Sequence, residues 1–406
     1  MESRLRYIDS REKIVFFLLC LSFLLLCISP LVSAVSAMFI MFVFGGGFKK
    51  EETLFFSILA MLSVVFIISS RGISPVSSGV HDDINVYYSV YQYILSNKFE
   101  ALFTFGGGVE VGLPLYFYFL SCIFGDITQN QLVLLVNLLI GFLFINWTYK
   151  NYQNICQVKY LAFLISGTVL FYSFGYSSLL LRQYISCVFL LYALTEKRRS
   201  IAFILMLLAV SFHTSAFLFF VIAKVCLNQK TPLVKMFILS LVVFLAIYFA
   251  ALIVDIEIVN RNLIYYGDGG AGANFISGRE INGFTFKILL LSTIVVIVAE
   301  LMSVLLKRQR AKFNRYSYFI FLMLFVTIFT MDYAWVPTRA FLIPVFFILP
   351  ILVFMSMGMH QFRFFQIFIA LIFLFRIKTW FLFPDSEISL WVGYSWWGYP
   401  FYYIFS

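Results

Sequence analysis

The sequence has 406 residues, of which 62% are hydrophobic and 12% are charged, and its formal net charge is +10. A soluble domain is about 25% charged and about half apolar, so this composition excludes an ordinary soluble enzyme. Apolar blocks of about 17–25 residues recur along the whole chain, and each is about long enough to cross a hydrocarbon core of about 30 Å. The sequence therefore predicts an all-α polytopic integral membrane protein.

The positive charge lies in short segments between the apolar blocks, a distribution that argues against a nucleic-acid-binding protein. Examples are "RLRYIDSREK" at 4–13, "KRR" at 197–199 and "KRQRAKFNR" at 307–315. Basic clusters of this kind mark cytoplasmic loops. With these segments inside, the predicted outer loops are residues 71–131, 255–284, 332–337 and 384–406.

The apolar blocks predict about 11–13 transmembrane helices in a single membrane domain over residues 1–406. Two segments, 111–125 and 200–226, do not fit a simple crossing and are predicted to be re-entrant or broken. The other candidate spans are about 14–30, 31–47, 54–70, 132–149, 160–177, 179–195, 233–254, 285–306, 316–332, 338–357 and 364–383.

The first outer loop is rich in carboxylates and tyrosines and contains the stretch "HDDINVYYSVYQYIL". A helix that starts near Asp82 places Asp83, Tyr87 and Tyr91 on one face. The aspartates are either catalytic carboxylates or a helix N-cap beneath interfacial tyrosines. Asp82, Asp83 and Tyr87 are therefore candidate site residues.

Residues 111–125 are too short to cross comfortably, and they contain Pro114. The basic stretch at 150–159 and the loop at 71–110 should lie on opposite sides, yet two apolar segments separate them. We therefore expect residues 111–125 to dip into the membrane and return to the outer side, which is tolerated where protein or a watery cavity surrounds the backbone. Glu110, directly before this segment, is a further candidate carboxylate.

Arg182 opens the apolar helix predicted at 179–195 on its outer side, where the inside-positive bias disfavours it. It either snorkels to lipid headgroups or presents its fork of donors to an anion such as phosphate. Arg279 and Arg339 are further arginines predicted on the outer side. Several arginines that face one compartment indicate a polyphosphate or acidic ligand.

The segment 200–226 has basic residues on both flanks and His213 near its middle. If both flanks are cytoplasmic, the segment is a hairpin with arms of about 12 residues, or about 18 Å each. Its apex, "SFHTS", then opens to the same compartment as Arg182. The alternative is one tilted helix of about 26 residues, or about 39 Å, that packs the histidine in a core.

No motif predicts a metal or a cofactor. The three histidines lie far apart, and neither a D-x-D nor an H-E-x-x-H pattern occurs. The six cysteines have no C-x-x-C spacing and are interpreted as small buried hydrophobic residues. The sequence has no P-loop and hence no evidence for nucleotide hydrolysis.

Four short patterns follow one another within residues 80–220. They are D-x-x-x-Y at Asp83 and Tyr87, "EVGL" at Glu110–Leu113, "RQ" at Arg182 and Gln183, and A-x-x-F-H-x-S-A at Ala209–Ala216. In this order they resemble the EpsG/Wzy family of bacterial polysaccharide polymerases, relatives of the O-antigen ligases within the glycosyltransferase C superfamily. In "EVGL", valine and leucine replace the proline and the aromatic residue of the family's E-P-G-F-like motif.

The resemblance implies a metal-independent O-antigen polymerase at the periplasmic face of the bacterial inner membrane. Donor and acceptor would both be oligosaccharides linked to undecaprenyl diphosphate in membrane lipid, and a chain-length regulator is a further implied partner. The growing glycan would move en bloc onto a sugar hydroxyl of the next unit, without a cofactor. Fixed positive groups would stabilise the departing diphosphate, and a base would activate the hydroxyl. The diphosphate-binding candidates are Arg182, Arg279, Arg339, Tyr87 and Gln183, and the catalytic candidates are Asp82, Asp83, Glu110 and His213.

Three other functions remain open from the sequence. An O-antigen ligase would use the same donor with a lipid A core acceptor. A flippase for lipid-linked oligosaccharides would line a path through both leaflets with charge, whereas most non-cytoplasmic charge here is predicted outside. A membrane-bound acyltransferase would direct its histidine to the cytoplasm, opposite to the side predicted for His213.

Overall fold

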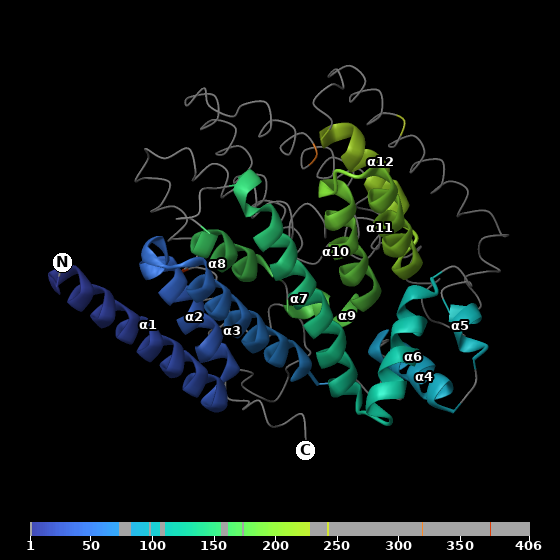
Figure 1. Ribbon diagram of the computed structural model, residues 1–406. Helices are drawn as coiled ribbons and strands as arrows, with labels where there is room; N and C mark the ends of the chain where they lie inside the picture. The colour runs from blue at the N-terminus through green and yellow to red at the C-terminus, as the bar shows by residue number, and fades with distance from the viewer. Residues whose placement is uncertain are drawn as a thin grey trace. The chain divides into compact units, whose positions relative to one another are not determined.

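The structure, a computed structural model, describes residues 2–72, 83–96, 99–105, 110–155, 161–172 and 174–227, together with a few isolated positions further on. Every regular element in these ranges is a helix (Figure 1), which confirms the predicted all-α membrane fold. Within the described residues, three stretches are long and apolar enough to cross a membrane, namely Pro30–Gly47, Lys50–Ser69 and Gln129–Asn151. The predicted spans from residue 233 onward lie outside the described ranges, so the number of crossings stays a prediction.

The chain divides into two compact units, residues 1–214 with 360–406, and residues 215–359. The helices up to Phe212 belong to the first unit. In the second unit the described helix is α12 (Ala216–Leu227). The single membrane domain over residues 1–406 stays a prediction.

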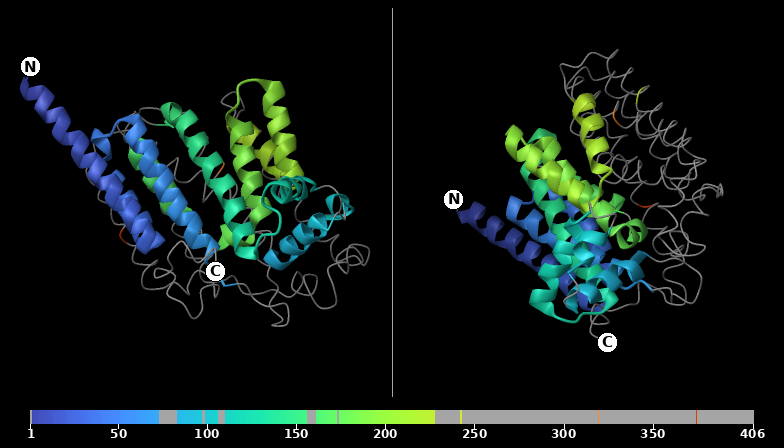
Figure 2. Two further views of the ribbon diagram at one scale, coloured as in Figure 1. Left: turned by 60° about the horizontal axis from the view of Figure 1, so that its bottom comes forward. Right: turned by 90° about the vertical axis from the view of Figure 1, so that its right-hand side faces the viewer.

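The first three helices lie side by side (Figure 2), and serine hydroxyls form hydrogen bonds between them. Their bounds are α1 (Glu2–Ile28), α2 (Pro30–Phe44) and α3 (Lys50–Ser69). Ser33 is fully buried, and its hydroxyl donates to the Ser22 carbonyl at 2.8 Å and accepts from the Ser63 hydroxyl at 3.0 Å. Hydroxyls that bond inside the bundle satisfy their own polar groups while their small size lets the helices approach closely.

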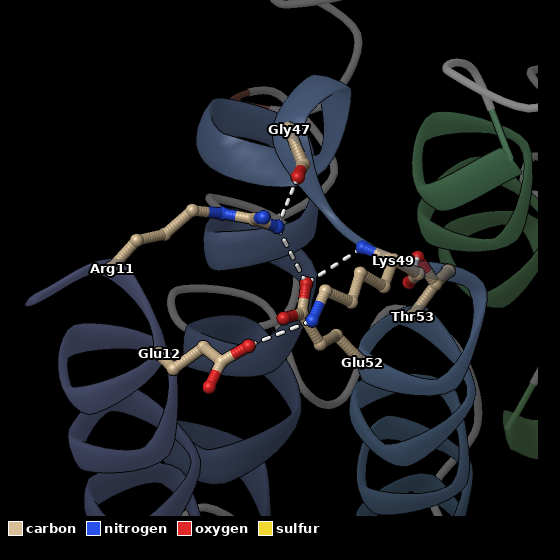
Figure 3. Close-up of polar contacts among 6 residues, drawn as sticks. All are labelled: Arg11, Glu12, Gly47, Lys49, Glu52 and Thr53. Carbon is tan, nitrogen blue, oxygen red and sulfur yellow. Dashed lines mark hydrogen bonds and ion pairs between the residues drawn. The ribbon is translucent and has the colours of Figure 1, made fainter. Parts of the chain in front are cut away.

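One end of this three-helix group is fixed by a cluster of charged side chains (Figure 3). A 3-10 turn at Gly45–Gly47 leads into α3, and the Arg11 guanidinium donates to the Gly47 carbonyl and, at 2.9 Å, to Glu52. The Lys49 ammonium donates to Glu12 at 2.7 Å. Exposed ion pairs contribute little stability, so this cluster mainly sets the position of α1 against the turn.

The predicted span at 160–177 is two helices in the structure. The bounds are α7 (Gln129–Ile155), α8 (Leu161–Phe171) and α9 (Phe174–Leu179). The side-chain N–H of the buried Asn137 in α7 donates to the Ser177 carbonyl at 3.4 Å, and its side-chain oxygen accepts from the Tyr172 hydroxyl at 3.5 Å. Asn137 thus contacts both α9 and the residue that follows α8.

Residues 83–125 lie in the predicted outer loop and contain three short helices, of which the first begins at Asp83, near the predicted start at Asp82. The bounds are α4 (Asp83–Leu95), α5 (Ala101–Thr104) and α6 (Gly112–Phe124). With 13 residues, α6 is only about 20 Å long, too short to cross a hydrocarbon core of about 30 Å. The ring of Tyr91 packs edge-on against Phe117, 6.0 Å between centroids, and its hydroxyl donates to the carbonyl of Gly125. Gly125 ends α6 at φ +64°, a conformation that favours glycine.

Two further helices, α10 (Leu181–Thr195) and α11 (Arg199–Phe212), pack against each other. The Ser186 hydroxyl donates to the Ala209 carbonyl at 2.8 Å, and the rings of Phe189 and Phe212 stack at 5.5 Å. The predicted break in segment 200–226 is confirmed, because α11 ends at Phe212 and the backbone of the next residue, His213, is extended at φ −156° and ψ 120°. The direction of the second arm stays a prediction.

Candidate functional site

The Glu110 carboxylate is the centre of a polar cluster that joins three parts of the chain. It is 4% exposed and lies two residues before the start of α6. One of its oxygens, Oε2, accepts a hydrogen bond from the Arg182 guanidinium at the start of α10. The other, Oε1, lies 2.7 Å from Nδ1 of His213 at the end of α11. Glu110 thus binds together residues that are 72 and 103 positions away in the sequence.

Thr214 adds two more donors to the same carboxylate oxygen. Its backbone N–H lies 3.0 Å from Glu110 Oε1, and its hydroxyl lies 3.2 Å from that oxygen. Both donors are available because α11 ends at Phe212 and the backbone leaves the helix at His213. The two residues that follow α11 therefore supply three groups to one oxygen of Glu110, namely the His213 ring, the Thr214 N–H and the Thr214 hydroxyl.

Two aromatic rings lie close to the Arg182 guanidinium. Its Cζ lies 5.0 Å from the centre of the Phe105 ring and 5.8 Å from that of Tyr87, within the range of cation–π attraction. Tyr87 also forms a side-chain hydrogen bond with Arg182, and Asp83 contributes a favourable charge. The Arg182 side chain remains 21% exposed. Arg182 is thus a supported cation with part of its surface open, an arrangement suited to an anionic ligand.

The charge state of Glu110 follows from its neighbours. Burial alone would raise the pKa of the Glu110 carboxyl, but the hydrogen bond from His213, the charge of Arg182 and the Thr214 N–H together lower this pKa to about 2. An ionised carboxylate only accepts hydrogen bonds, so Nδ1 of His213 carries the proton in this pair. The other ring nitrogen, Nε2, is then the one that exchanges a proton in chemistry.

A close backbone contact brings Glu110 to the end of α11. A Cβ atom on Gly112 would lie 2.7 Å from the Ser211 hydroxyl oxygen, 2.9 Å from the Phe212 ring and 2.9 Å from the Ser211 carbonyl carbon. Only a glycine fits at this distance without displacing backbone. The glycine of "EVGL" thus allows the start of α6 to touch α11 and places Glu110 beside His213.

The structure brings together several of the residues that the sequence predicts for the site. Glu110 contacts both Arg182 and His213, Tyr87 forms a hydrogen bond with Arg182, and Asp83 lies close enough to act on the charge of Arg182. Gln183 is buried on α10. Three predicted residues, Asp82, Arg279 and Arg339, lie outside the described residues.

Three site residues were missed by sequence reasoning, namely Thr214, Gly112 and Phe105. Thr214 occupies the variable position of the A-x-x-F-H-x-S-A pattern, and Gly112 is part of "EVGL". The signal for both residues is that they lie within short patterns whose neighbouring residues, His213 and Glu110, are already candidates. Phe105 lies in an aromatic stretch before three glycines, and nothing in that stretch connects it to Arg182.

Among the described residues, no group of three or more His, Cys, Asp or Glu side chains is arranged to hold a metal ion. The polar groups that the structure places together at this site are the Arg182 guanidinium, the His213 imidazole and the Glu110 carboxylate. Such a set can bind a phosphate and exchange a proton.

Comparison with models of protein families matches the chain to the EpsG family. The match covers residues 55–400, which is most of the chain and includes the whole cluster around Glu110. No curated protein and no solved structure matches the chain. The chain therefore belongs to the EpsG family, a family of Wzy-like polysaccharide polymerase and glycosyltransferase-like membrane proteins.

Proposed function

We propose that this membrane protein is an O-antigen polymerase that acts at the periplasmic face of the bacterial inner membrane. It transfers a growing glycan from undecaprenyl diphosphate onto the next repeat unit, itself linked to undecaprenyl diphosphate. The observation that carries the proposal is the contact of Glu110 with Arg182 and His213 in a chain of the EpsG family. This cluster offers an anion-binding group beside a proton acceptor, the two requirements of the transfer.

In the transfer, the oxygen of the acceptor hydroxyl attacks the anomeric carbon of the donor glycan. The bond from that carbon to the diphosphate oxygen breaks, and undecaprenyl diphosphate departs with the electron pair. Arg182 stabilises the developing negative charge on this leaving group. The contacts of its guanidinium with the rings of Tyr87 and Phe105 support that role, because a donor held in place needs no reorganisation during the reaction.

His213 receives the proton of the attacking hydroxyl at Nε2. Glu110 is a poor proton acceptor, because its pKa is lowered to about 2 and three donor groups already occupy Oε1. Its role in the proposal is to orient the imidazole through Nδ1 and to stabilise the imidazolium that forms. Glu110 thus changes from a candidate base to the residue that links the base to the anion-binding arginine.

In this scheme the diphosphate linkage itself supplies the free energy of the transfer, so no nucleotide is needed. Arg182 takes the place that a metal ion holds in other phosphate-releasing glycosyl transfers. Asp83 is a second carboxylate near Arg182, and its proposed role is to hold the arginine at the edge of the cluster. Asp82, Arg279 and Arg339 remain proposed contributors to substrate binding, and a chain-length regulator remains a proposed partner.

The chain length of the glycan tests the proposal. A strain that lacks this gene is expected to make lipopolysaccharide capped with a single repeat unit, and the intact gene restores the ladder of long chains. Arg182→Ala is expected to abolish the long chains and to leave the single-unit cap, because a ligase would still act. The measurement is the glycan ladder on a gel.

Arg11→Ala is the matched control, because Arg11 also pairs with a glutamate and lies in the cluster at α1 and α3. It is expected to retain the full ladder. Unchanged chain length in Arg182→Ala would contradict the diphosphate-binding role. Complete loss of capped lipopolysaccharide in the deletion strain would instead indicate the O-antigen ligase.

A further inference from the structure

Thr214 contacts the Glu110–His213 pair and is itself open to the surroundings. Its N–H and hydroxyl lie 3.0 Å and 3.2 Å from Glu110 Oε1, the oxygen that also contacts His213. Thr214 is exposed, whereas Glu110 and His213 are 4% and 6% exposed. Thr214 is therefore positioned at the edge of the buried pair.

The two bonds from Thr214 determine how the carboxylate is turned. The terminal torsion of a glutamate side chain is broad, so each further fixed donor on a carboxylate oxygen narrows the range of this torsion. Oε2 has Arg182, and Oε1 has the His213 ring, which can itself rotate. The Thr214 N–H belongs to the backbone, and its direction is set by the end of α11. With the hydroxyl beside it, the plane of the carboxylate is defined.

The orientation of the carboxylate affects the positions of both functional groups. His213 Nδ1–H is bonded to Oε1 and the Arg182 guanidinium to Oε2, so a turn of the carboxylate would shift both. We infer that Thr214 is a positioning residue, which acts through Glu110 to hold the His213 ring and Arg182 in the relation that the transfer needs. This inference rests on the proposed polymerase function.

Replacement of the hydroxyl separates the positioning role from the shape of the side chain. Thr214→Val keeps the branched shape and the backbone N–H but removes the hydroxyl donor. Thr214→Ser keeps the hydroxyl and removes a methyl group. Removal of a group that acts only in the transition state lowers kcat and leaves KM unchanged. The expected result for Thr214→Val is a kcat lowered about 10-fold, equivalent to about 1.4 kcal/mol.

The assay uses the full-length purified protein and lipid-linked oligosaccharide extracted from cells in which its gene is deleted. Thr214→Ser is expected to restore kcat, and KM is expected to stay within about twofold in both variants. Thr53→Val is the matched control, because the Thr53 hydroxyl donates to the Lys49 carbonyl at 3.1 Å in α3 and has no contact with the site. It is expected to keep the wild-type kcat.

The outcomes separate the inference from the function on which it rests. An unchanged kcat in Thr214→Val, or a Thr214→Ser protein as slow as Thr214→Val, would overturn the positioning role. A change in KM alone would also overturn it, since Thr214 would then contact the substrate uniformly. If the wild-type protein does not extend the extracted oligosaccharide, the polymerase function fails, and the inference fails with it.

Discussion

At the scale of single residues, the negative charge of Glu110 holds two positive or proton-donating groups that come from different helices. Glu110→Gln keeps the size of the side chain but removes the negative charge that contacts Arg182. Removal of one partner from a buried pair costs about 3 kcal/mol, because the other charge remains desolvated. We therefore expect a lowered melting temperature together with loss of long glycan chains. Thermal unfolding of the purified protein and the glycan ladder measure the two effects.

Glu12→Gln is the control for this substitution. Glu12 pairs with Lys49, but the two side chains are 52% and 53% exposed, so solvent screens the pair. Little change in melting temperature is expected. A Glu110→Gln protein as stable as Glu12→Gln would show that the Glu110 pairs contribute no net stability.

The stability of the wild-type and Glu110→Gln proteins, compared as a function of pH, shows the sign of the Glu110 contribution. The pKa of Glu110 is lowered from 4.5 to about 2 in the folded protein, so its charge stabilises the fold above pH 4.5 and loses this effect as pH falls toward 2. The difference in stability between wild type and Glu110→Gln is therefore expected to shrink as pH falls from about 4.5 toward 2. A difference that grows over this acidic range would contradict the assigned charge.

At the scale of helices, the contact between the start of α6 and the end of α11 sets the geometry of the site. Gly112→Ala introduces a Cβ atom 2.9 Å from the Ser211 carbonyl carbon, and this backbone atom cannot rotate away. The two helices must separate, which moves Glu110 from His213. We expect loss of activity with a smaller loss of stability, measured by the glycan ladder and by thermal unfolding.

Gly46→Ala is the matched control for Gly112→Ala. No atom lies within 4 Å of a Cβ on Gly46, so the substitution needs no movement of the chain. Wild-type chain length is expected. If Gly112→Ala also retains wild-type chain length, close contact of α6 with α11 is not required for function.

The sequence predicts those helical features that depend on neighbouring residues. The start of α4 at Asp83, the short α6 and the break at His213 follow from local spacing and from the charges that flank each segment. The separation of α8 from α9 was not predicted, because the amide of Asn137 that bonds at the break lies 40 positions from Ser177. Local patterns contain no signal for a partner at that distance.

The candidate site shows the same division between local and distant information. Glu110 and Arg182 are selected because each lies at the start of an apolar segment, and His213 because it lies near the middle of one. Their mutual contacts and the part of Thr214 depend on the packing of α6 and α10 with α11. The sequence therefore predicts candidates, whereas the relation of a carboxylate to its base and its cation requires the three-dimensional structure.

At the scale of the whole molecule, the orientation in the membrane decides which compartment supplies the substrate. α10 ends near Lys197, and α11 begins at Arg199, so the basic residues lie at one end of this pair and Arg182 and His213 at the other. The 15 residues of α10 separate these ends by about 22 Å. Since basic clusters favour the cytoplasm, the cluster around Glu110 is expected on the periplasmic side.

Accessibility of engineered cysteines to a membrane-impermeant thiol reagent tests this orientation. The starting protein has its six native cysteines replaced by alanine, because Cys27 and Cys122 are exposed and would react. Ser211→Cys and Ser215→Cys, on either side of His213, are expected to react in intact cells from the outside. Glu196→Cys, next to the basic turn, is the control and is expected to react only after the membrane is opened. Labelling of positions 211 and 215 solely from the cytoplasm would place His213 on the wrong side for a periplasmic donor, and it would exclude both the hairpin and the proposed polymerase orientation.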